Sequence, residues 1–492
     1  MPRRGGDTGR GPGRRHRVPA RPRRPVKTVH EVVSVTPERG DAGRFVNRFG
    51  RPAAVVLVLL CGFTLLLGFI NKDRCTGPAF DQWGRTQPDY DERNKQEVCY
   101  SDIQHLWIGR DIDRHVFPYV DGGISDQGVL VGGSVEYPVL TGLVIWAGAI
   151  FAHNDAEYLL YSSLLMAPFG LLTGWLLGKL ARWRALLWAI GPPLILYAFH
   201  NWDLPVVLCS VAAVYVVHRW NRPLVERATV ASVLLGLGFA FKVYPAAFVL
   251  PLMLYVASGG WRGQELPEGK KVDVVGAIRV GLASIVTVVL VNLPFAFAGY
   301  DGWLASFEFQ QLRRVDITTN SIWYWGLRPF IGDDAMQSLV GVISPITILL
   351  SFAIAAGYGW MRFRREGSYP WIAVSGAMLC GFMLLHKVHS PQYTLWLVPF
   401  LVLLRVRLLW AYAYFVVDLA MGIGIFRWFW AIEFGQPAGI YDSFSAQAVM
   451  IGVWGRAALL VALFVAFLKA RDVTEDDHKD PKFLRGAVAA KR

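Results

Sequence analysis

Four cations and one carboxylate in this sequence could act together on a phosphorylated substrate. The cations are Lys242, Arg313, Arg314 and Lys387, and the carboxylate is Asp102. Lysine and arginine bind phosphate oxygens through charge-assisted hydrogen bonds, and a carboxylate can take a proton from a hydroxyl as a general base. A sugar joined to a lipid through phosphate suits these residues, because the lipid stays in a membrane while the phosphate is the leaving group. No glycine-rich phosphate loop lies between a strand and a helix, so nucleotide use has no support.

Further polar residues lie in short motifs between the apolar runs, and they could bind the sugar or its acceptor. They are Glu136, Tyr137, Asn201, Asp203, Tyr244, His386, His389 and Gln392. Structural roles remain open for several of them. Glu136 could cap a helix, and Asp203 could complement the dipole at a helix N-terminus.

The same alternatives apply to the charged residues. Asp102 could be one of the 14 acidic residues of segment 71–158, and Lys242 could extend its amine to lipid headgroups. Asp418 lies within a predicted span, where an acid either has a function or forms a buried pair. Four residues could be interfacial anchors: Arg313, Arg314, His386 and His389.

The composition excludes a soluble enzyme. Hydrophobic residues make up 54% and charged residues 18% of the chain, and the mean hydropathy is +0.35, whereas soluble domains contain about 25% charged residues. Many apolar runs approach the length of about 20 residues that crosses a bilayer, and they predict an all-α integral membrane protein with about twelve spans. The predicted spans are 53–70, 159–178, 185–199, 203–217, 228–241, 245–258, 276–298, 337–360, 371–385, 392–404, 408–425 and 446–468.

Positive charge orients these spans and decides the status of one more apolar run, 139–152. Cytoplasmic loops of membrane proteins are rich in Lys and Arg. If 139–152 does not cross the membrane, basic loops such as 179–184 and 361–370 lie inside. Segment 71–158, with 7 basic and 14 acidic residues, is then the long outer first loop. We therefore predict a juxtamembrane helix at 139–152, two cytoplasmic termini and a site that faces outward from the cytoplasmic membrane.

The charge also divides the chain. Residues 1–52 contain 14 Lys or Arg and 4 Asp or Glu, which predicts a disordered cytoplasmic tail that contacts anionic membrane lipid. Nucleic-acid binding is the alternative for this tail, and it is not expected. Residues 53–468 are predicted to form the membrane domain, and residues 469–492 a second cytoplasmic tail.

The sequence contains few cysteines, and only two of them suggest a specific role. Cys75 and Cys99 both lie in the outer loop, where a disulfide bond between them is one of two outcomes. The sequence contains no CxxC motif and no His/Cys cluster, so we expect no metal. No residue pattern indicates a cofactor.

Several motifs occur in an order that resembles a known family. They are Tyr100-Ser101-Asp102-Ile103, Phe117-Pro118-Tyr119, Glu136-Tyr137-Pro138-Val139-Leu140-Thr141, Phe241-Lys242-Val243-Tyr244-Pro245 and His389-Ser390-Pro391-Gln392-Tyr393, followed by Leu395, Trp396 and Pro399. Over residues 50–465 the chain resembles glycosyltransferase family 87. Members of this family are GT-C-type, polyprenol-phosphate-mannose-dependent α-mannosyltransferases of actinobacteria.

The resemblance implies specific roles. It implies that Asp102 is the catalytic base and that polyprenyl-phosphate-mannose is the donor. It further implies an inverting transfer from a β donor to an α product without a metal, and a juxtamembrane helix after Pro138. One departure concerns a second acid, which many GT-C enzymes carry beside the first. Asp102 has no acidic neighbour, and Asp111 and Asp113 follow nine and eleven residues later.

Two functions of different kinds follow from these observations. The first is a GT-C-like membrane glycosyltransferase that moves a sugar, most simply mannose, from a polyprenyl phosphate to a lipid-anchored glycan acceptor. The alternative is a flippase or transporter of a lipid-linked sugar. The sequence disfavours the alternative because charges within the spans are scarce and no inverted repeat is visible. A scaffold that recruits partners through its basic tail is a third, weaker interpretation.

Overall fold

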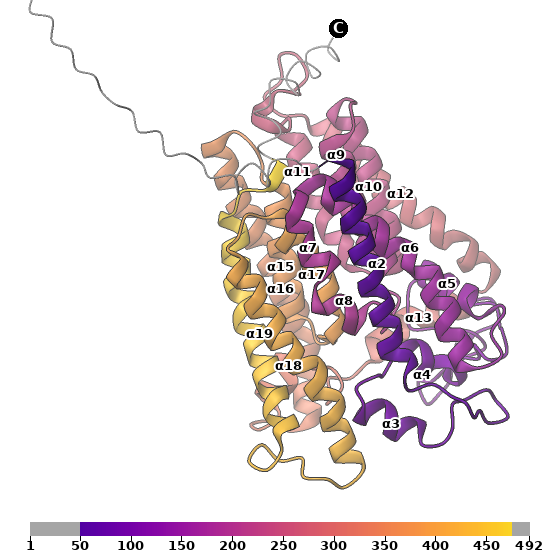
Figure 1. The fold of residues 1–492 in the computed structure, drawn as a ribbon. Coiled ribbons are helices and arrows are strands. Elements are labelled where there is room, and N and C mark those ends of the chain that lie inside the picture. The colour runs from indigo at the N-terminus through magenta and orange to yellow at the C-terminus, as the bar shows by residue number, and fades with distance from the viewer. Residues whose placement is uncertain (1–49, 475–492) are drawn as a thin grey trace, which may run out of the picture. The chain divides into compact units, whose positions relative to one another are not determined.

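A computed structural model describes residues 50–474 of the chain, and these residues form a bundle of helices (Figure 1). The predictions for the two tails, 1–52 and 469–492, lie almost entirely outside the described residues. Seven helices of the described part are long and apolar enough to cross a membrane. They are α2 (Arg51–Asp73), α6 (Asp155–Ala181), α10 (Leu224–Phe241), α12 (Val274–Ala298), α15 (Asp333–Glu366), α18 (Leu408–Glu433) and α19 (Phe444–Lys469).

The other five predicted spans are short or broken helices, so the count of about twelve spans is not confirmed. The elements at these positions are α7 (Leu186–Ala189) and α8 (Pro192–Tyr197), α9 (Leu204–Arg219), η2 (Tyr244–Phe248) and α11 (Val249–Ala257), α16 (Trp371–Leu385), and η4 (Pro391–Tyr393) and α17 (Thr394–Leu403). Prolines explain several of the breaks, since a proline lacks the amide that would continue a helix. Pro192 and Pro245, for example, lie in the first turn of α8 and of η2.

The short helices α16 and α17 form much of the interior. Every residue of α17 is buried, and almost all of α16 is buried as well. Both helices are apolar on all sides, which is the pattern of a helix surrounded by others. By contrast, α12 and α15 expose many large apolar side chains, including Leu290 and Leu349, as expected for helices that contact lipid.

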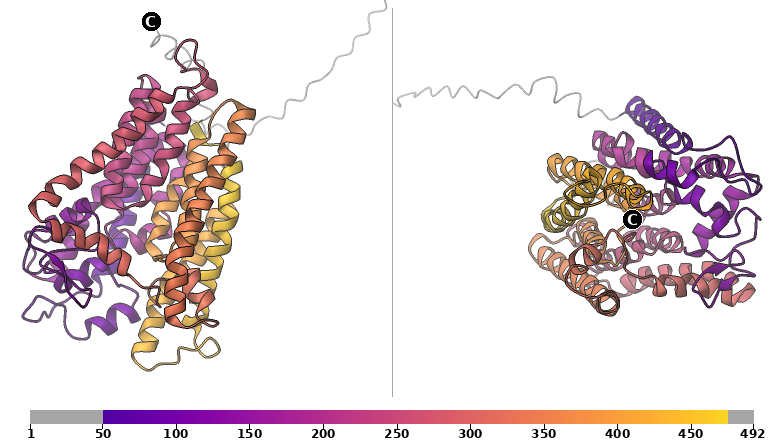
Figure 2. Two further views of the ribbon diagram at one scale, coloured as in Figure 1. Left: turned by 180° about the vertical axis from the view of Figure 1, so that it is seen from behind. Right: turned by 90° about the horizontal axis from the view of Figure 1, so that it is seen from below.

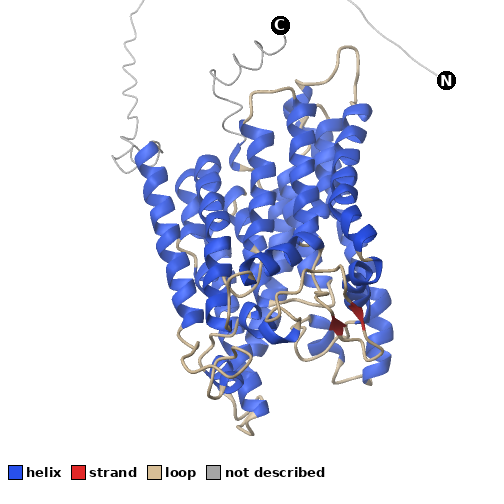
Figure 3. Ribbon diagram, turned by 90° about the vertical axis from the view of Figure 1, so that its right-hand side faces the viewer, coloured by secondary structure: helices blue, strands red, loops and turns tan. Residues whose placement is uncertain are grey.

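One end of the bundle, here named the α4 end, is built from residues 74–153 and 299–332. It contains α3 (Tyr90–Gln96), α4 (Asp102–Gly109), β1 (Gly123–Ile124), β2 (Leu130–Val131), α5 (Val139–Ala149), α13 (Tyr300–Leu312) and α14 (Ile322–Leu327). The two strands pair antiparallel, and Figure 3 shows them among the loops of this end. The remaining short elements are η1 (Arg182–Ala185) and η3 (Trp261–Gly263).

Helix α5 corresponds to the apolar run 139–152. Its 11 residues give a length of about 16 Å, which is about half the thickness of a hydrocarbon core. It packs beside α6 at the α4 end, away from the opposite end of the bundle (Figure 2). A helix of this length cannot cross a bilayer by itself.

The acid Asp418 lies inside the bundle and is paired. Its carboxylate lies 3.7 Å from Nη1 of Arg456 on α19, and the hydroxyl of Thr394 donates to it at 2.6 Å. Both charged side chains are almost fully buried. Of the two interpretations offered for Asp418, the structure shows the buried pair.

A disulfide bond joins Cys75, just after α2, to Cys99, just before α4. It therefore ties the end of a long helix to the segment that leads into Asp102. Replacing both cysteines by serine is expected to lower the free energy of unfolding by about 2–4 kcal/mol. Thermal unfolding of the purified protein measures this loss, and Cys209→Ser, at a free cysteine, is the control. An unchanged unfolding midpoint in the double variant would contradict the prediction.

A polar cavity at the α4 end

A cavity of about 750 Å³ opens at the α4 end between segments that are far apart in the sequence. Its walls come from α4, from the segments that follow α8, α10 and α16, from α13 and from the end of α18. Ligand sites commonly have volumes of about 300–1,000 Å³. The cavity is therefore large enough for a sugar phosphate and part of an acceptor.

The cavity collects most, but not all, of the residues singled out from the sequence. Those that line it are Asp102, Glu136, Tyr137, Asn201, Lys242, Arg313, His386, Lys387 and Gln392. Asp203, Tyr244, His389 and Arg314 do not line it.

Asp102 is held in the wall by backbone contacts at the start of α4. It is the first residue of this helix, and Ser101 caps the helix by accepting a hydrogen bond from the amide of Ile103. The amide of Asp102 donates to the carbonyl of His200 at 2.8 Å, and the hydroxyl of Ser101 donates to the carbonyl of Phe199 at 2.7 Å. The segment between α2 and α5 is thus attached to the segment after α8 at the point where the carboxylate enters the cavity.

Two side chains donate hydrogen bonds to the Asp102 carboxylate. The hydroxyl of Tyr100 donates to Oδ1 at 3.0 Å, and Nδ2 of Asn201 donates to Oδ2 at 2.6 Å. The same Asn201 nitrogen contacts the hydroxyl of Tyr137 at 2.7 Å. Since each carboxylate oxygen has a second lone pair, Asp102 can still accept a proton from a substrate.

Lys242 orients Asn201 from the opposite side. Its Nζ donates to Oδ1 of Asn201 at 2.8 Å and lies 4.2 Å from the centroid of the Tyr137 ring. Its counter-ion is Asp203, with 3.8 Å between Nζ and Oδ1, and Nε1 of Trp396 also donates to that oxygen at 2.8 Å. Burial lowers the pKa of Lys242, and the nearby Asp203 carboxylate opposes this shift.

Asp203 and Tyr244 therefore lie behind the cavity wall, and their predicted contact with sugar or acceptor has no geometric basis. Asp203 is fully buried, where it carries the charge that balances Lys242. The ring of Tyr244 stacks on Trp396 with centroids 4.3 Å apart, and its hydroxyl meets Ser210 at 3.4 Å. Both residues support the wall from the side of the helix core.

The predicted phosphate-binding cations occupy different environments. Arg313 lines the cavity, and within the described residues its guanidinium has no ion-pair partner. Arg314, the next residue, is exposed and pairs with Asp333 and Asp334 at the start of α15. Helix α13 ends at Leu312, and its C-cap residue Arg313 has non-helical backbone angles, so both arginines lie beyond the helix.

Lys387 uses its amine to hold the end of α13. Its Nζ donates to the carbonyls of Gln310, Gln311 and Arg313 at 3.0, 3.3 and 2.9 Å. Carbonyls at a helix C-terminus lack intrahelical partners, and a lysine there satisfies them. An ammonium has three donors, so this lysine supports the backbone that carries Arg313.

Glu136 faces the cavity as an ion pair. Its Oε2 accepts a hydrogen bond from Nε of Arg110 at 2.9 Å, and its carbonyl accepts one from Gln310 at 2.7 Å. Glu136 precedes α5 by three residues, and the N-cap position belongs to Pro138. The structure thus shows a link between the first loop and α13 instead of a helix cap.

Burial favours the neutral form of two histidines that line the cavity, His200 and His386. Burial lowers the pKa of His200 and that of His386 to about 4. Nδ1 of His386 contacts the carbonyl of Val388 at 2.9 Å. His389 is buried outside the cavity, and its amide donates to the carbonyl of Thr319 at 2.7 Å.

Several lining residues were not among the predicted site residues. Tyr100 and His200 adjoin predicted residues in motifs that were already apparent, so adjacency was the available signal. No signal in the sequence indicated Arg110, because its partner Glu136 lies 26 residues away. The candidate second acids, Asp111 and Asp113, do not line the cavity; Asp111 accepts a hydrogen bond from the amide of Gly132 and pairs with Arg114.

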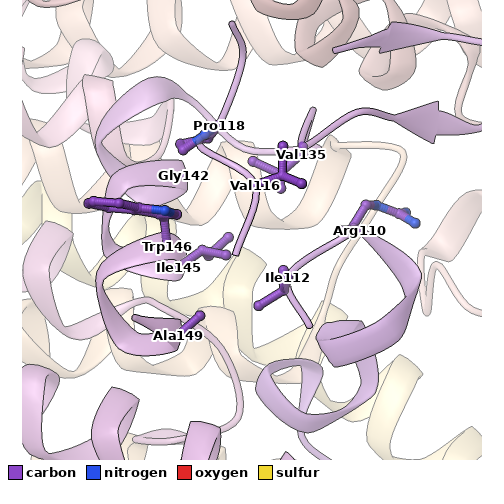
Figure 4. A pocket seen from close by; sticks show the side chains of 10 residues that line it. Arg110, Ile112, Val116, Pro118, Val135, Gly142, Ile145, Trp146 and Ala149 are labelled. Carbon is purple, nitrogen blue, oxygen red and sulfur yellow. The ribbon is translucent and has the colours of Figure 1, made fainter. Parts of the chain in front are cut away.

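A second, much smaller cavity lies beneath α5. Its volume is about 10 Å³, which is about the space of one water molecule. Figure 4 shows that its lining is mostly apolar, from Ile112 and Val116 to Ile145 and Trp146. It is too small for a substrate, and Arg110 contributes to the lining of both cavities.

Apolar helices of membrane length, with a carboxylate-bearing cavity at one end, define a multi-pass membrane enzyme, and comparison with known proteins identifies its kind. The mannosyltransferase (PIG-M) family matches residues 200–469. The chain belongs to this family of GT-C-type glycosyltransferases. The matched range contains Asn201, Lys242 and Arg313 but not Asp102, and the assignment to glycosyltransferase family 87 is not confirmed.

The chain is also similar to individual known proteins. The chain is 26% identical to GPI mannosyltransferase 1 of Trypanosoma brucei brucei over 371 residues, which are 69% of this chain and 74% of that protein. Two structures of the Archaeoglobus fulgidus oligosaccharyltransferase are also similar. The apo form is 13% identical with a TM-score of 0.36, covering 85% of this chain and 56% of that one. The complex with an inhibitory peptide and a dolichol-phosphate is 11% identical with a TM-score of 0.38, covering 84% and 56%.

Proposed function

We propose that this protein transfers mannose from a polyprenyl-phosphate donor to a hydroxyl of a lipid-anchored glycan, with inversion and without a metal. The observation that carries the proposal is the Asp102 carboxylate, which lies in a cavity at one end of membrane-length helices and keeps free lone pairs. Membership of a mannosyltransferase family supports mannose as the sugar.

The reaction follows from the residues around the cavity. Asp102 takes the proton of the acceptor hydroxyl as the oxygen attacks the anomeric carbon of the donor. The bond from that carbon to the phosphate oxygen breaks, and polyprenyl phosphate leaves with the electron pair. Attack on the face opposite the phosphate inverts the anomeric configuration. Arg313 stabilises the negative charge that develops on the departing phosphate.

The orientation of the cavity is part of the proposal. Arg362, Arg364 and Arg365 lie in the last turns of α15, at the opposite end of the bundle. Segments that are rich in arginine and lie just outside the membrane stay on the cytoplasmic side. The α4 end then faces outward, where a lipid-linked donor can supply a sugar without a nucleotide. The lipid chain of the donor remains in the bilayer beside the bundle.

Arg313→Gln is expected to raise the KM for the donor about ten- to hundredfold, because it removes a charge-assisted hydrogen bond to phosphate. Initial rates over a range of donor concentrations measure this change. Arg314→Gln is the matched control, since this neighbour is exposed and pairs with Asp333 and Asp334 outside the cavity. Equal effects of the two substitutions on KM would remove Arg313 from the phosphate site.

The direct test uses the purified protein in liposomes with radiolabelled polyprenyl-phosphate-mannose and a lipid extract as acceptor. The expected result is a mannosylated lipid that requires the intact protein. Movement of the donor between leaflets without a product would instead identify a flippase. A cysteine placed at residue 364 and labelled only from outside would contradict the proposed orientation.

A further inference from the structure

A buried lysine lies behind the segment that presents Asp102. Lys72 is the second-to-last residue of α2, and only 2% of its surface is exposed. Its Nζ donates a hydrogen bond to the carbonyl of Tyr100 at 2.7 Å. It does not line the cavity, so it approaches the Asp102 segment from the side of the helix bundle.

Among the described residues near the cavity, Asp102 is an acid without an ion-pair partner, and Lys72, like Arg313 and Lys387, is a cation without one. Lys242 has Asp203, Arg110 has Glu136, and Lys95 has Glu433. Among residues 50–474, no carboxylate lies within 4.0 Å of Lys72, and no cation lies within 4.0 Å of Asp102. An ammonium taken out of water is strongly unfavourable unless another charge compensates it, and one carbonyl contact uses only one of its three donors.

Tyr100 forms hydrogen bonds with both Lys72 and Asp102. The carbonyl of Tyr100 accepts a hydrogen bond from the Lys72 ammonium, and the hydroxyl of Tyr100 donates one to the Asp102 carboxylate. Nδ1 of His200 contacts the same carbonyl at 3.2 Å. The ammonium and the carboxylate therefore contact the backbone carbonyl and the side-chain hydroxyl of the same residue.

We propose that Lys72 is a positioning residue for the transfer reaction, which holds the Tyr100–Asp102 segment in the cavity wall and stabilises Asp102 as an anion. This inference rests on the proposed function of Asp102 as the base. A base must be deprotonated before it can accept a proton, and a nearby positive charge favours that state. The sequence offered no sign of this role, since Lys72 reads as the end of a membrane span.

Other titratable groups also face Asp102 and must be separated from the effect of Lys72. They are Tyr90, Tyr100, His105, Glu136, Tyr137, His200, Asp203, Lys242 and Tyr393. Burial raises the pKa of the tyrosines and lowers the pKa of the histidines, so these groups stay neutral near pH 7. The Glu136–Arg110 and Asp203–Lys242 pairs are present in every variant and contribute equally.

The test compares Lys72→Arg, Lys72→Gln and Lys72→Met in the full-length protein in liposomes, with kcat and KM measured across pH. Arginine keeps the charge, glutamine keeps a donor for the Tyr100 carbonyl without charge, and methionine keeps neither. We expect glutamine and methionine to lower kcat at pH 7 at least tenfold with less than a twofold change in KM. In the glutamine and methionine variants, the midpoint of the acid limb of the kcat–pH profile should move up by about one pH unit. The arginine variant should retain most of the wild-type activity.

Two controls make the outcome decisive. Lys179→Gln changes a lysine near the end of α6, outside the cavity, and should leave kcat and its pH profile unchanged. Repeating Lys72→Gln in the His200→Gln background removes the histidine whose pKa is about 4, so that the shift can be assigned to Asp102. An unshifted acid limb in Lys72→Gln, or full kcat in that variant, would overturn the inference. A wild-type protein that forms no product would instead overturn the proposed function.

Discussion

Asp102→Asn is expected to lower kcat for mannose transfer by about 10²–10⁴-fold, the range that a positioned general base contributes. The substitution keeps the shape of the side chain and an acceptor for the Tyr100 hydroxyl. It removes the charge and the lone pair that would take the proton from the acceptor. Initial rates with saturating donor and acceptor measure the effect, and the KM for the donor should change little.

The arrangement around Asn201 adds a second consequence for this variant. Nδ2 of Asn201 donates to Oδ2 of Asp102 and also contacts the hydroxyl of Tyr137. An amide nitrogen placed at Oδ2 would face another donor, so the new side chain must turn or the contact is lost. Asp102→Ala should therefore be at least as inactive as Asp102→Asn.

Asp111→Asn is the matched control for this prediction. Asp111 lies nine residues further along the same segment, outside the cavity, and accepts a hydrogen bond from the amide of Gly132. Its substitution should leave kcat within about twofold of the wild type, as expected of a surface change without a special role. Normal transfer by Asp102→Asn, or loss of transfer by Asp111→Asn alone, would show that Asp102 is not the general base.

Lys242→Met is expected to lower the free energy of unfolding by about 3–5 kcal/mol, because it leaves a buried carboxylate without its counter-ion. Asp203 is fully buried, and only Lys242 balances its charge at close range among the described residues. The same change releases Oδ1 of Asn201 from its hydrogen bond with the ammonium. Activity should therefore fall together with the unfolding midpoint.

The double variant Lys242→Met/Asp203→Asn distinguishes charge from packing. Removing both charges eliminates the unpaired carboxylate, and an asparagine can still accept the hydrogen bond from Trp396. The double variant should regain most of the stability that the single variant loses, while its activity stays low because Asn201 remains unsupported. Thermal unfolding in detergent measures the regained stability, and the liposome assay measures the activity. Additive losses of stability would show that the two charges act independently.

Much of the site was visible in the sequence because a membrane protein keeps polar side chains out of its spans. Asn201 and Lys242 stand at the ends of apolar runs, and Asp102 lies in the long loop that follows the first run. The alternation of the runs predicts one common side for all three, and positive charge in the loops predicts which side that is. The resemblance of the motifs pointed to a GT-C mannosyltransferase, and the family match agrees with that class.

Contacts between distant segments were not visible in this way. Arg313 and Arg314 are adjacent and chemically identical, and only the end of α13 at Leu312 decides which one reaches the cavity. Lys387 looked like a phosphate ligand, but the carbonyls at that helix end use its donors. Tyr244 was predicted to bind the sugar or its acceptor, and its stacking on Trp396 places it in the core.

The sequence by itself determined the class of the molecule, a multi-pass membrane protein whose reactive groups lie in its loops, because the cost of placing polar groups in hydrocarbon restricts where they occur. Only the tertiary structure decided which of those groups meet. Asp102 and Asn201 lie 99 positions apart and touch at 2.6 Å, and Lys72 reaches Tyr100 from within a helix end. Such pairs depend on packing and electrostatics between segments, which no local pattern of residues records.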